Sequence, residues 1–114
     1  MITIYHNPRC GTSRNTLALI QARGFEPRIV EYLKTPFSHD ELTRLIREAG
    51  LSVREAIRTK EALYTELGLD AAHITDKTLL DAMVSHPVLV NRPFVTTPKG
   101  SRLCRPAEIV ETLL

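Results

Sequence analysis

The chain has 114 residues, of which 43% are apolar, and a formal net charge of +2 at pH 7. This length and composition suit one compact domain with a sizeable core, and the small charge excess gives no electrostatic reason to expect a nucleic-acid or membrane partner. No stretch is apolar over the roughly 20 residues needed to span a bilayer, and the first residues lack the pattern of a signal peptide, so we expect a cytoplasmic protein.

The first third of the chain predicts a β-α-β unit. Residues 1–5 form a short apolar run that is typical of a strand. Residues 12–23 have the apolar spacing of a helix that packs on one side, and Gly24 follows as a stop signal. Residues 27–33 predict a second strand. A strand, a helix and a strand in this order imply that the two strands are parallel neighbours.

The middle of the chain predicts a series of short helices. Ser38 and Ser52 each precede a glutamate by three residues, which is the capping-box pattern found at the start of a helix. Apolar spacing predicts two further helices over residues 60–67 and 76–85. Together these segments form a helical insertion at about residues 38–86.

The last third predicts a β-hairpin followed by a helix. Two strands, over residues 94–96 and 102–104, flank the turn residues 98–100, and Pro106 at a first helical position opens the closing helix. The whole order is β-α-β, a helical insertion, and β-β-α. This is the thioredoxin-like α/β arrangement with an inserted helical subdomain, so we expect a single domain over residues 1–114 with a small mixed sheet.

Cys10 is the strongest candidate for chemistry. It lies where the first strand gives way to a helix, so unpaired backbone N–H groups and the positive end of the helix dipole would stabilise a thiolate there. Arg9 and Arg14 add positive charge nearby. We expect Cys10 to have a lowered pKa and to act as a nucleophile, with the same N–H groups available to an oxyanion. The alternative is that Cys10 is a small buried apolar residue, as most single cysteines are.

Two known cysteine motifs do not fit the sequence around Cys10. A dithiol motif needs a second cysteine where the chain has Ser13, and a tyrosine-phosphatase-like loop needs an arginine where it has Thr16. An oxyanion attacked by Cys10 would therefore need positive groups from elsewhere. The bond between Arg92 and Pro93, before the predicted third strand, is a candidate cis peptide. The candidate oxyanion ligands, each of which also fits an ordinary surface residue, are Arg58, Arg92 and Arg105.

Other residues have weaker assignments. His6 could lower the pKa of Cys10 as an imidazolium or through a hydrogen bond, or it could simply pack at the strand end. The hydroxyls of Thr12 and Ser13 are expected to cap the helix rather than to donate to an oxyanion. Cys104 is expected to be a buried thiol without a role, and the scattered histidines and cysteines predict no metal site. The residues that could support the site are His6, Gly11, Thr12 and Ser13.

The segments that contain these residues resemble the glutaredoxin-dependent arsenate reductases of bacteria. The resemblance runs from residues 2–16 through residues 86–93 to residues 102–106, and it covers essentially the whole chain. It also supports the thioredoxin-like topology, which periodicity alone does not establish. It implies that Cys10 attacks arsenate, and that glutathione as co-substrate and glutaredoxin as partner supply the electrons without a bound cofactor. The oxyanion ligands that it implies are Arg58, Arg92 and Arg105.

Two alternatives differ from this interpretation. One is a related thiol reductase that acts on another substrate. The other is a regulatory binding protein of the Spx type, which binds RNA polymerase and is not an enzyme. Spx-type proteins commonly have Cys-x-x-Cys in the loop, whereas this chain has Cys-Gly-Thr-Ser together with the three arginines. The sequence therefore favours the enzyme.

Overall fold

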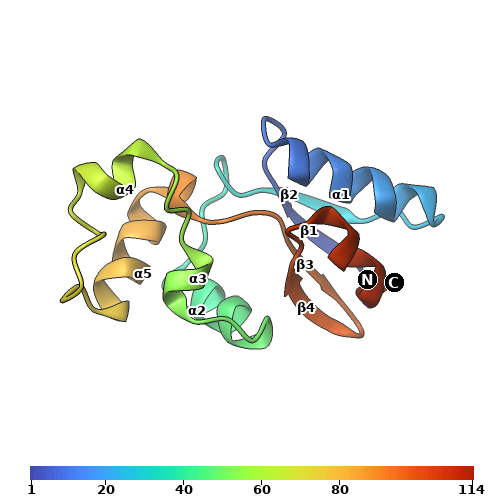
Figure 1. The fold of residues 1–114 in the computed structure, drawn as a ribbon. Helices are drawn as coiled ribbons and strands as arrows, with labels where there is room; N and C mark the ends of the chain where they lie inside the picture. The colour runs from blue at the N-terminus through green and yellow to red at the C-terminus, as the bar shows by residue number, and fades with distance from the viewer. The chain divides into compact units, whose positions relative to one another are not determined.

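The computed structural model describes all of residues 1–114 (Figure 1). The chain divides into two compact units. Unit 1 consists of Met1–Thr35 together with Arg92–Leu114, and unit 2 consists of Pro36–Asn91. Unit 1 is thus assembled from the two ends of the sequence, whereas unit 2 is one continuous segment. That the chain acts as a single domain stays a prediction.

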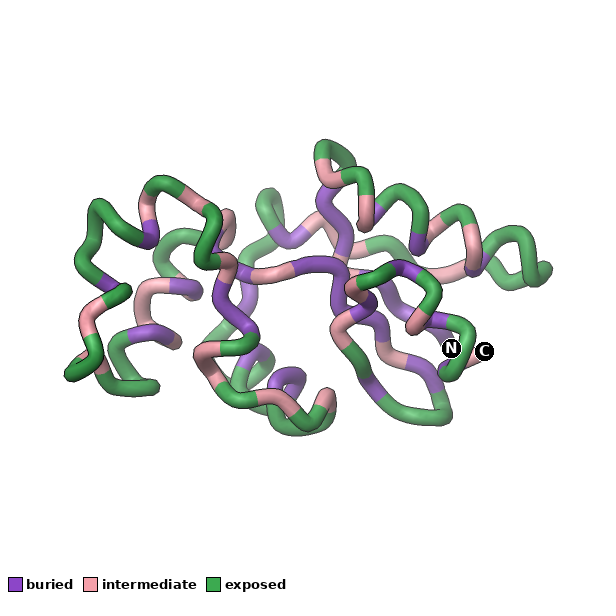
Figure 2. Tube along the Cα trace, viewed as in Figure 1, coloured by how far each residue is buried: buried purple, intermediate pink, exposed green.

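Unit 1 contains a four-stranded sheet made of β1 (Thr3–His6), β2 (Arg28–Glu31), β3 (Phe94–Thr97) and β4 (Gly100–Leu103), in the order β2-β1-β3-β4. β1 pairs in parallel with β2 and antiparallel with β3, and β3 pairs antiparallel with β4. The mixed sheet, the parallel pair and the hairpin predicted from the sequence are confirmed. The two inner strands, β1 and β3, are mostly buried (Figure 2).

Two helices of unit 1, α1 (Gly11–Ala22) and the 3-10 helix η2 (Ala107–Leu113), share an apolar core with the sheet. The predicted helix after the first strand is confirmed, and it ends before Gly24, whose φ of 85° suits a glycine. The side chains of this core come from β1, α1, β3 and η2 and from the residues beside them. Its buried members are Ile2, Ile4, Ile20, Val95, Cys104, Val110 and Leu113.

The closing helix differs from the prediction in two ways. Pro106 is the N-cap and not the first helical residue, because its ψ of 164° is extended. The helix is also of the 3-10 type. Its buried residues are Ala107, Val110 and Leu113, which are spaced by three. A helix with three residues per turn keeps such residues in one line, so this form aligns all three with the core.

Unit 2 is helical, with α2 (His39–Glu48), α3 (Val53–Ala56), α4 (Ala62–Glu66), α5 (Asp76–Ser85) and a short 3-10 helix, η1 (Pro87–Leu89). The predicted helices are confirmed, although α4 is shorter than residues 60–67, and η1 was not predicted. None of the helices in the protein has the length and apolar character required to cross a lipid bilayer.

Both predicted capping boxes are present in unit 2. At the start of α2, the Glu41 N–H donates to Ser38 Oγ at 3.1 Å, and the Ser38 N–H donates to Glu41 Oε1 at 3.0 Å. Ser52 and Glu55 repeat the arrangement at the start of α3. Each box satisfies two backbone N–H groups that the first turn of a helix leaves unpaired, which is why these short helices begin where they do.

Candidate active site

Cys10 is the N-cap residue of α1, at the point where the chain leaves β1 and enters the helix. Its backbone is extended, with φ −91° and ψ 122°, and its carbonyl accepts the N–H of Arg14 at 3.0 Å. No side chain caps the helix. The N–H groups of the first turn are therefore left to face whatever lies at the helix start, and the half-buried Cys10 thiol lies there.

Hydrogen bonds within the loop hold Cys10 in this position. The Cys10 N–H donates to the carbonyl of Asn7 at 3.0 Å, the Arg9 N–H donates to Asn7 Oδ1 at 3.0 Å, and Arg14 Nη1 donates to the carbonyl of Pro8 at 2.9 Å. Asn7 is buried. Sequence reasoning misses this organising role of Asn7, and the signal that could have revealed it is the Asn-Pro pair, which is typical of turns.

His6 and Ser13 form a buried hydrogen bond under the loop. His6 Nδ1 lies 2.6 Å from Ser13 Oγ, which also accepts the N–H of Asn7 at 3.1 Å. Burial lowers the pKa of His6, the Glu31 carboxylate raises it and the Arg14 guanidinium lowers it, so that the pKa lies below its ordinary value. His6 is therefore mainly neutral at pH 7. This favours the hydrogen-bonding role for His6 over the predicted alternative of an imidazolium.

The supporting residues of the first helical turn act differently from the prediction. The hydroxyls of Thr12 and Ser13 do not cap α1, so that expectation is wrong. The Ser13 hydroxyl is held instead by His6 and by the backbone of the loop. A Cβ added to Gly11 would lie 3.7 Å from Arg14 Nη2, an ordinary contact, so the space beside Gly11 does not demand a glycine.

The charge around the Cys10 sulfur comes from backbone N–H groups and from two arginines. Arg105 Nη1 lies 3.7 Å from Cys10 Sγ, and it also donates to the carbonyl of Arg92 at 2.9 Å. Burial raises the pKa of the Cys10 thiol. The Ser13 N–H, the guanidinium groups of Arg105 and Arg92, and the Thr12 N–H lower it by more, so the pKa lies below its ordinary value. The thiolate is thus favoured by hydrogen bonds to the charged form.

Sheet topology explains why these arginines reach Cys10. Tyr5 near the end of β1 pairs with Phe94 at the start of β3, and Phe94 pairs with Leu103 at the end of β4. The residues just outside these positions therefore lie at one edge of the sheet. Arg92 precedes β3 and is buried, and Arg105 follows β4 and is half-buried.

Both arginines precede a proline whose peptide bond is cis. The cis bond between Arg92 and Pro93 was predicted and is confirmed. The cis bond between Arg105 and Pro106 was not predicted.

Arg58, the third predicted oxyanion ligand, belongs to unit 2. Its backbone N–H donates to the carbonyl of Leu89 at 2.7 Å, beside an isolated bridge between Ile57 and Val90. Its Nε is buried and lies 3.4 Å from Glu61 Oε1, an ion pair whose geometry is not that of a hydrogen bond. The role of Arg58 towards Cys10 stays a prediction.

Cys104 is buried, as predicted. It is 0% exposed within the core of unit 1, and its Sγ lies 3.8 Å from the carbonyl of Arg102. Burial raises the pKa of the Cys104 thiol to about 12, although Arg102 lowers it slightly. The protein therefore has one thiol suited to reaction and one that burial keeps protonated.

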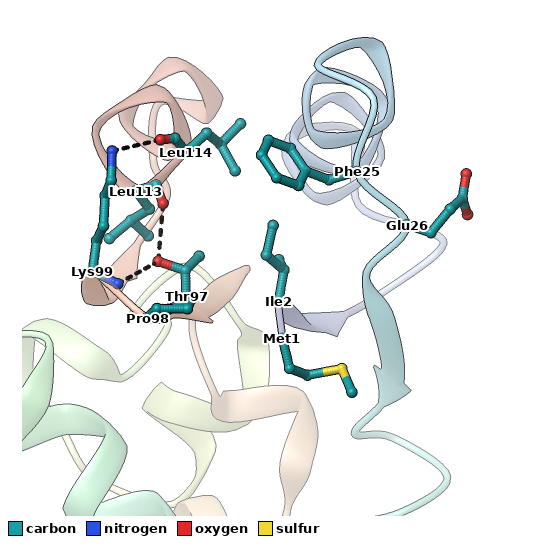
Figure 3. A pocket seen from close by; sticks show the side chains of 9 residues that line it. All are labelled: Met1, Ile2, Phe25, Glu26, Thr97, Pro98, Lys99, Leu113 and Leu114. Atoms are coloured by element: carbon teal, nitrogen blue, oxygen red, sulfur yellow. Dashed lines mark hydrogen bonds between the residues drawn. The ribbon is translucent and has the colours of Figure 1, made fainter.

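An apolar hollow of about 300 Å³ lies at the other edge of the sheet (Figure 3). Met1 and Ile2, which precede β1, form one side, and the residues of the turn between β3 and β4 form another. Thr97 Oγ1 donates to the carbonyl of Leu113 at 2.9 Å along one side of the hollow. The four residues of β1 lie between this hollow and the Cys10 loop, and a strand of four residues is about 13 Å long. No cysteine lines this apolar hollow, so we do not assign it to the candidate active site around Cys10.

Comparison with known proteins agrees with this geometry. Residues 5–113 match the ArsC family. The chain is 58% identical over 113 residues to a protein of Rhizobium meliloti (strain 1021) named arsenate reductase, covering 99% of this chain and 81% of that protein. It is 55% identical over 113 residues to the arsenate reductase of Escherichia coli (strain K12), covering 99% of this chain and 80% of that protein. The solved structure of an arsenate reductase from Vibrio cholerae aligns with a TM-score of 0.95 at 44% identity, covering 99% of this chain and 97% of that one. The chain therefore belongs to the ArsC family.

Proposed function

We propose that this protein reduces arsenate to arsenite through a covalent bond between arsenic and the Cys10 sulfur. One observation carries the proposal. The Cys10 thiol, whose pKa is lowered, lies at the start of α1 with Arg105 Nη1 at 3.7 Å. The relatives named arsenate reductases, at 55–58% identity over nearly the whole chain, support arsenate as the substrate.

The first step is attack of the Cys10 thiolate on arsenic. An As–S bond forms and one As–O bond breaks, and the oxygen leaves as water after taking up protons. Substrate and nucleophile are both anionic, so the site must offset their repulsion. The N–H groups of Thr12 and Ser13 and the guanidinium groups of Arg92 and Arg105 are the donors available for this, through charge-assisted hydrogen bonds. Arg58 is proposed as a third arginine ligand.

The reduction itself needs two electrons from outside the chain. Hydrogen arsenate, two thiols and two protons give arsenite, one disulfide and water. Ser13 stands where a resolving cysteine would be, and the other thiol, Cys104, is 0% exposed. Neither can close a disulfide with Cys10, so the thiols must be external.

We assign the two external thiols to glutathione and to glutaredoxin. Glutathione adds to arsenic in the Cys10 adduct and releases a second oxygen as water. The glutaredoxin thiol then attacks the glutathione sulfur, forming a disulfide between them, and the electron pair of the broken As–S bond remains on arsenic. Water finally cleaves the bond between As(III) and Cys10, which releases arsenite and restores the thiol. The chain needs no bound redox cofactor for this sequence.

The test is arsenate-dependent oxidation of NADPH in the presence of glutathione, glutathione reductase and glutaredoxin. Cys10→Ser should lower turnover by at least about 10³-fold, because no sulfur remains to form the adduct. The matched control is Cys104→Ala, which removes the buried thiol and should retain turnover. Activity that survives in Cys10→Ser would contradict the nucleophile. Activity that survives without glutathione would contradict the reductant but not arsenate reduction.

The arginine ligands are tested separately. Arg92→Ala should lower kcat/KM for arsenate by about 10²-fold or more, because the loss of a preorganised cationic donor costs this much in comparable sites. Circular dichroism should show that the fold is intact. Turnover equal to that of the wild type would remove Arg92 from the site.

A further inference from the structure

We propose that a hollow beside the Cys10 loop is the binding subsite of the thiol reductant, and that it takes an acidic tripeptide thiol such as glutathione by its charged ends. This inference rests on the proposed function, since it assumes that an external thiol must reach Cys10. The hollow lies within unit 1 and encloses about 280 Å³. It is lined by Asn7, Pro8, Arg9, Glu31, Leu33 and Lys34.

The fold builds this hollow from two fixed segments. β1 and β2 are parallel neighbours, with His6 opposite Glu31 as the last pair, so both strands end at the same edge of the sheet. β1 continues into the Cys10 loop, which its own hydrogen bonds hold. β2 continues into a turn in which the N–H groups of Lys34 and Thr35 donate to the carbonyl of Glu31 at 2.9 and 3.0 Å. Both walls are thus formed without a ligand, as is usual for small-molecule sites.

The charges of the hollow complement those of the tripeptide. Glutathione carries two carboxylates and one ammonium group at neutral pH, and the hollow offers two cations, Arg9 and Lys34, and one anion, Glu31. The Arg9 guanidinium has no hydrogen-bond or ion-pair partner in the protein, and Lys34 Nζ lies 3.5 Å from Glu31 Oε1 with 77% of its side chain exposed. Both cations are therefore available to carboxylates, and Leu33, 40% exposed, offers an apolar contact.

Size and position fit the same ligand. A volume of 280 Å³ lies just below the roughly 300–1,000 Å³ that small-molecule sites span, so the hollow suits a ligand no larger than one short peptide. An extended tripeptide is about 10 Å long. Its thiol lies in the middle of the peptide. Arg9, which lines the hollow, directly precedes Cys10, and consecutive Cα atoms are about 3.8 Å apart, so the hollow lies beside the loop that holds the nucleophile.

The first test compares two charge reversals on the same strand region. Lys34→Glu changes the hollow, whereas Arg28→Glu changes an exposed cation at the other end of β2, about 10 Å away. Lys34→Glu should raise the KM for glutathione about tenfold, since it replaces attraction by repulsion at an exposed position. The KM for arsenate should change less than twofold, and Arg28→Glu should match the wild type. An unchanged KM for glutathione in Lys34→Glu overturns the subsite.

The second test does not depend on turnover. S-methylglutathione, which cannot react, is titrated into the protein while amide shifts are followed by NMR. Shifts at residues 7, 9 and 31–34 that weaken in Lys34→Glu and persist in Arg28→Glu support the subsite, even if glutathione should fail to drive arsenate reduction. Shifts elsewhere, or none at millimolar ligand, overturn it. Failure of the proposed function and failure of the subsite are thereby distinguished.

Discussion

Replacing Ser13 by alanine should destabilise the protein, because two buried groups lose the hydroxyl to which they are hydrogen-bonded. Ser13 is 0% exposed, and its Oγ accepts the N–H of Asn7 at 3.1 Å and lies 2.6 Å from Nδ1 of His6. Both partners are buried, with 3% and 6% exposure. Each buried polar group left without a hydrogen bond costs about 1–3 kcal/mol. Because the small exposed part of each partner can regain some contact with water, we expect the free energy of unfolding to fall by about 2–4 kcal/mol.

Urea unfolding at pH 7.5, followed by circular dichroism, measures this loss. The matched control is Thr16→Val, which removes another buried hydroxyl from α1. Thr16 Oγ1 donates to the Thr12 carbonyl at 2.8 Å. In Thr16→Val this carbonyl still accepts a backbone N–H within α1, so no buried group is left without a hydrogen bond. The control should cost at most about 1 kcal/mol. A loss in Ser13→Ala no larger than that in Thr16→Val would refute the reasoning.

Four further predictions each concern a single residue. Arg105→Gln should move the pH profile of Cys10 alkylation by iodoacetamide to higher pH, because it removes a guanidinium that lowers the thiol pKa; an unmoved or lower midpoint would contradict this. Cys104 should stay unmodified in the folded protein at pH 8 while Cys10 is alkylated, as peptide mass spectrometry can show. With a folded-state pKa of about 12 against about 8.5 when unfolded, Cys104 keeps a proton that the unfolded chain loses. Stability relative to Cys104→Ala should therefore fall as pH rises above about 8.5, and an equal difference at pH 7 and pH 10 would be inconsistent with this. Ser38→Ala should cost about 1 kcal/mol in urea unfolding by removing the cap of α2, whereas no loss would mean that the box is not formed.

Local signals made much of the secondary structure predictable. The capping boxes at Ser38 and Ser52 mark helix starts because their bonds join residues three apart, and α5 begins and ends where its apolar spacing does. Gly24 marks the end of α1 for a similarly local reason. Features that depend on packing were harder. The closing helix has 3-10 geometry, and its buried residues are three apart; an α-helix also places such residues on one side, so apolar spacing alone did not distinguish the two.

In the candidate site too, features set by neighbouring residues could be predicted, whereas contacts made by the fold could not. Cys10 could be found from the sequence, because its position between a strand and a helix is local. Arg105 was one of three candidate ligands, but spacing could not show that it contacts Cys10, since the two residues are 95 positions apart and only the sheet brings them together. The Ser13 hydroxyl was misassigned as a cap because its partners, His6 and Asn7, precede the helix in a loop whose shape the sequence does not state.

The discontinuity of unit 1 has a consequence for protein synthesis. A ribosome makes β1, α1 and β2 first, then the whole of unit 2, and only then β3, β4 and η2. Unit 2 can begin to fold while the sheet is still half made, since domains and compact segments fold during translation. Cys10 emerges from the ribosome before unit 2 is made, whereas Arg92 and Arg105, which lower its pKa, emerge after unit 2. While unit 2 is being made, Cys10 therefore lacks the two guanidinium groups that help to lower its pKa, and the complete site forms only after Arg105 has been added.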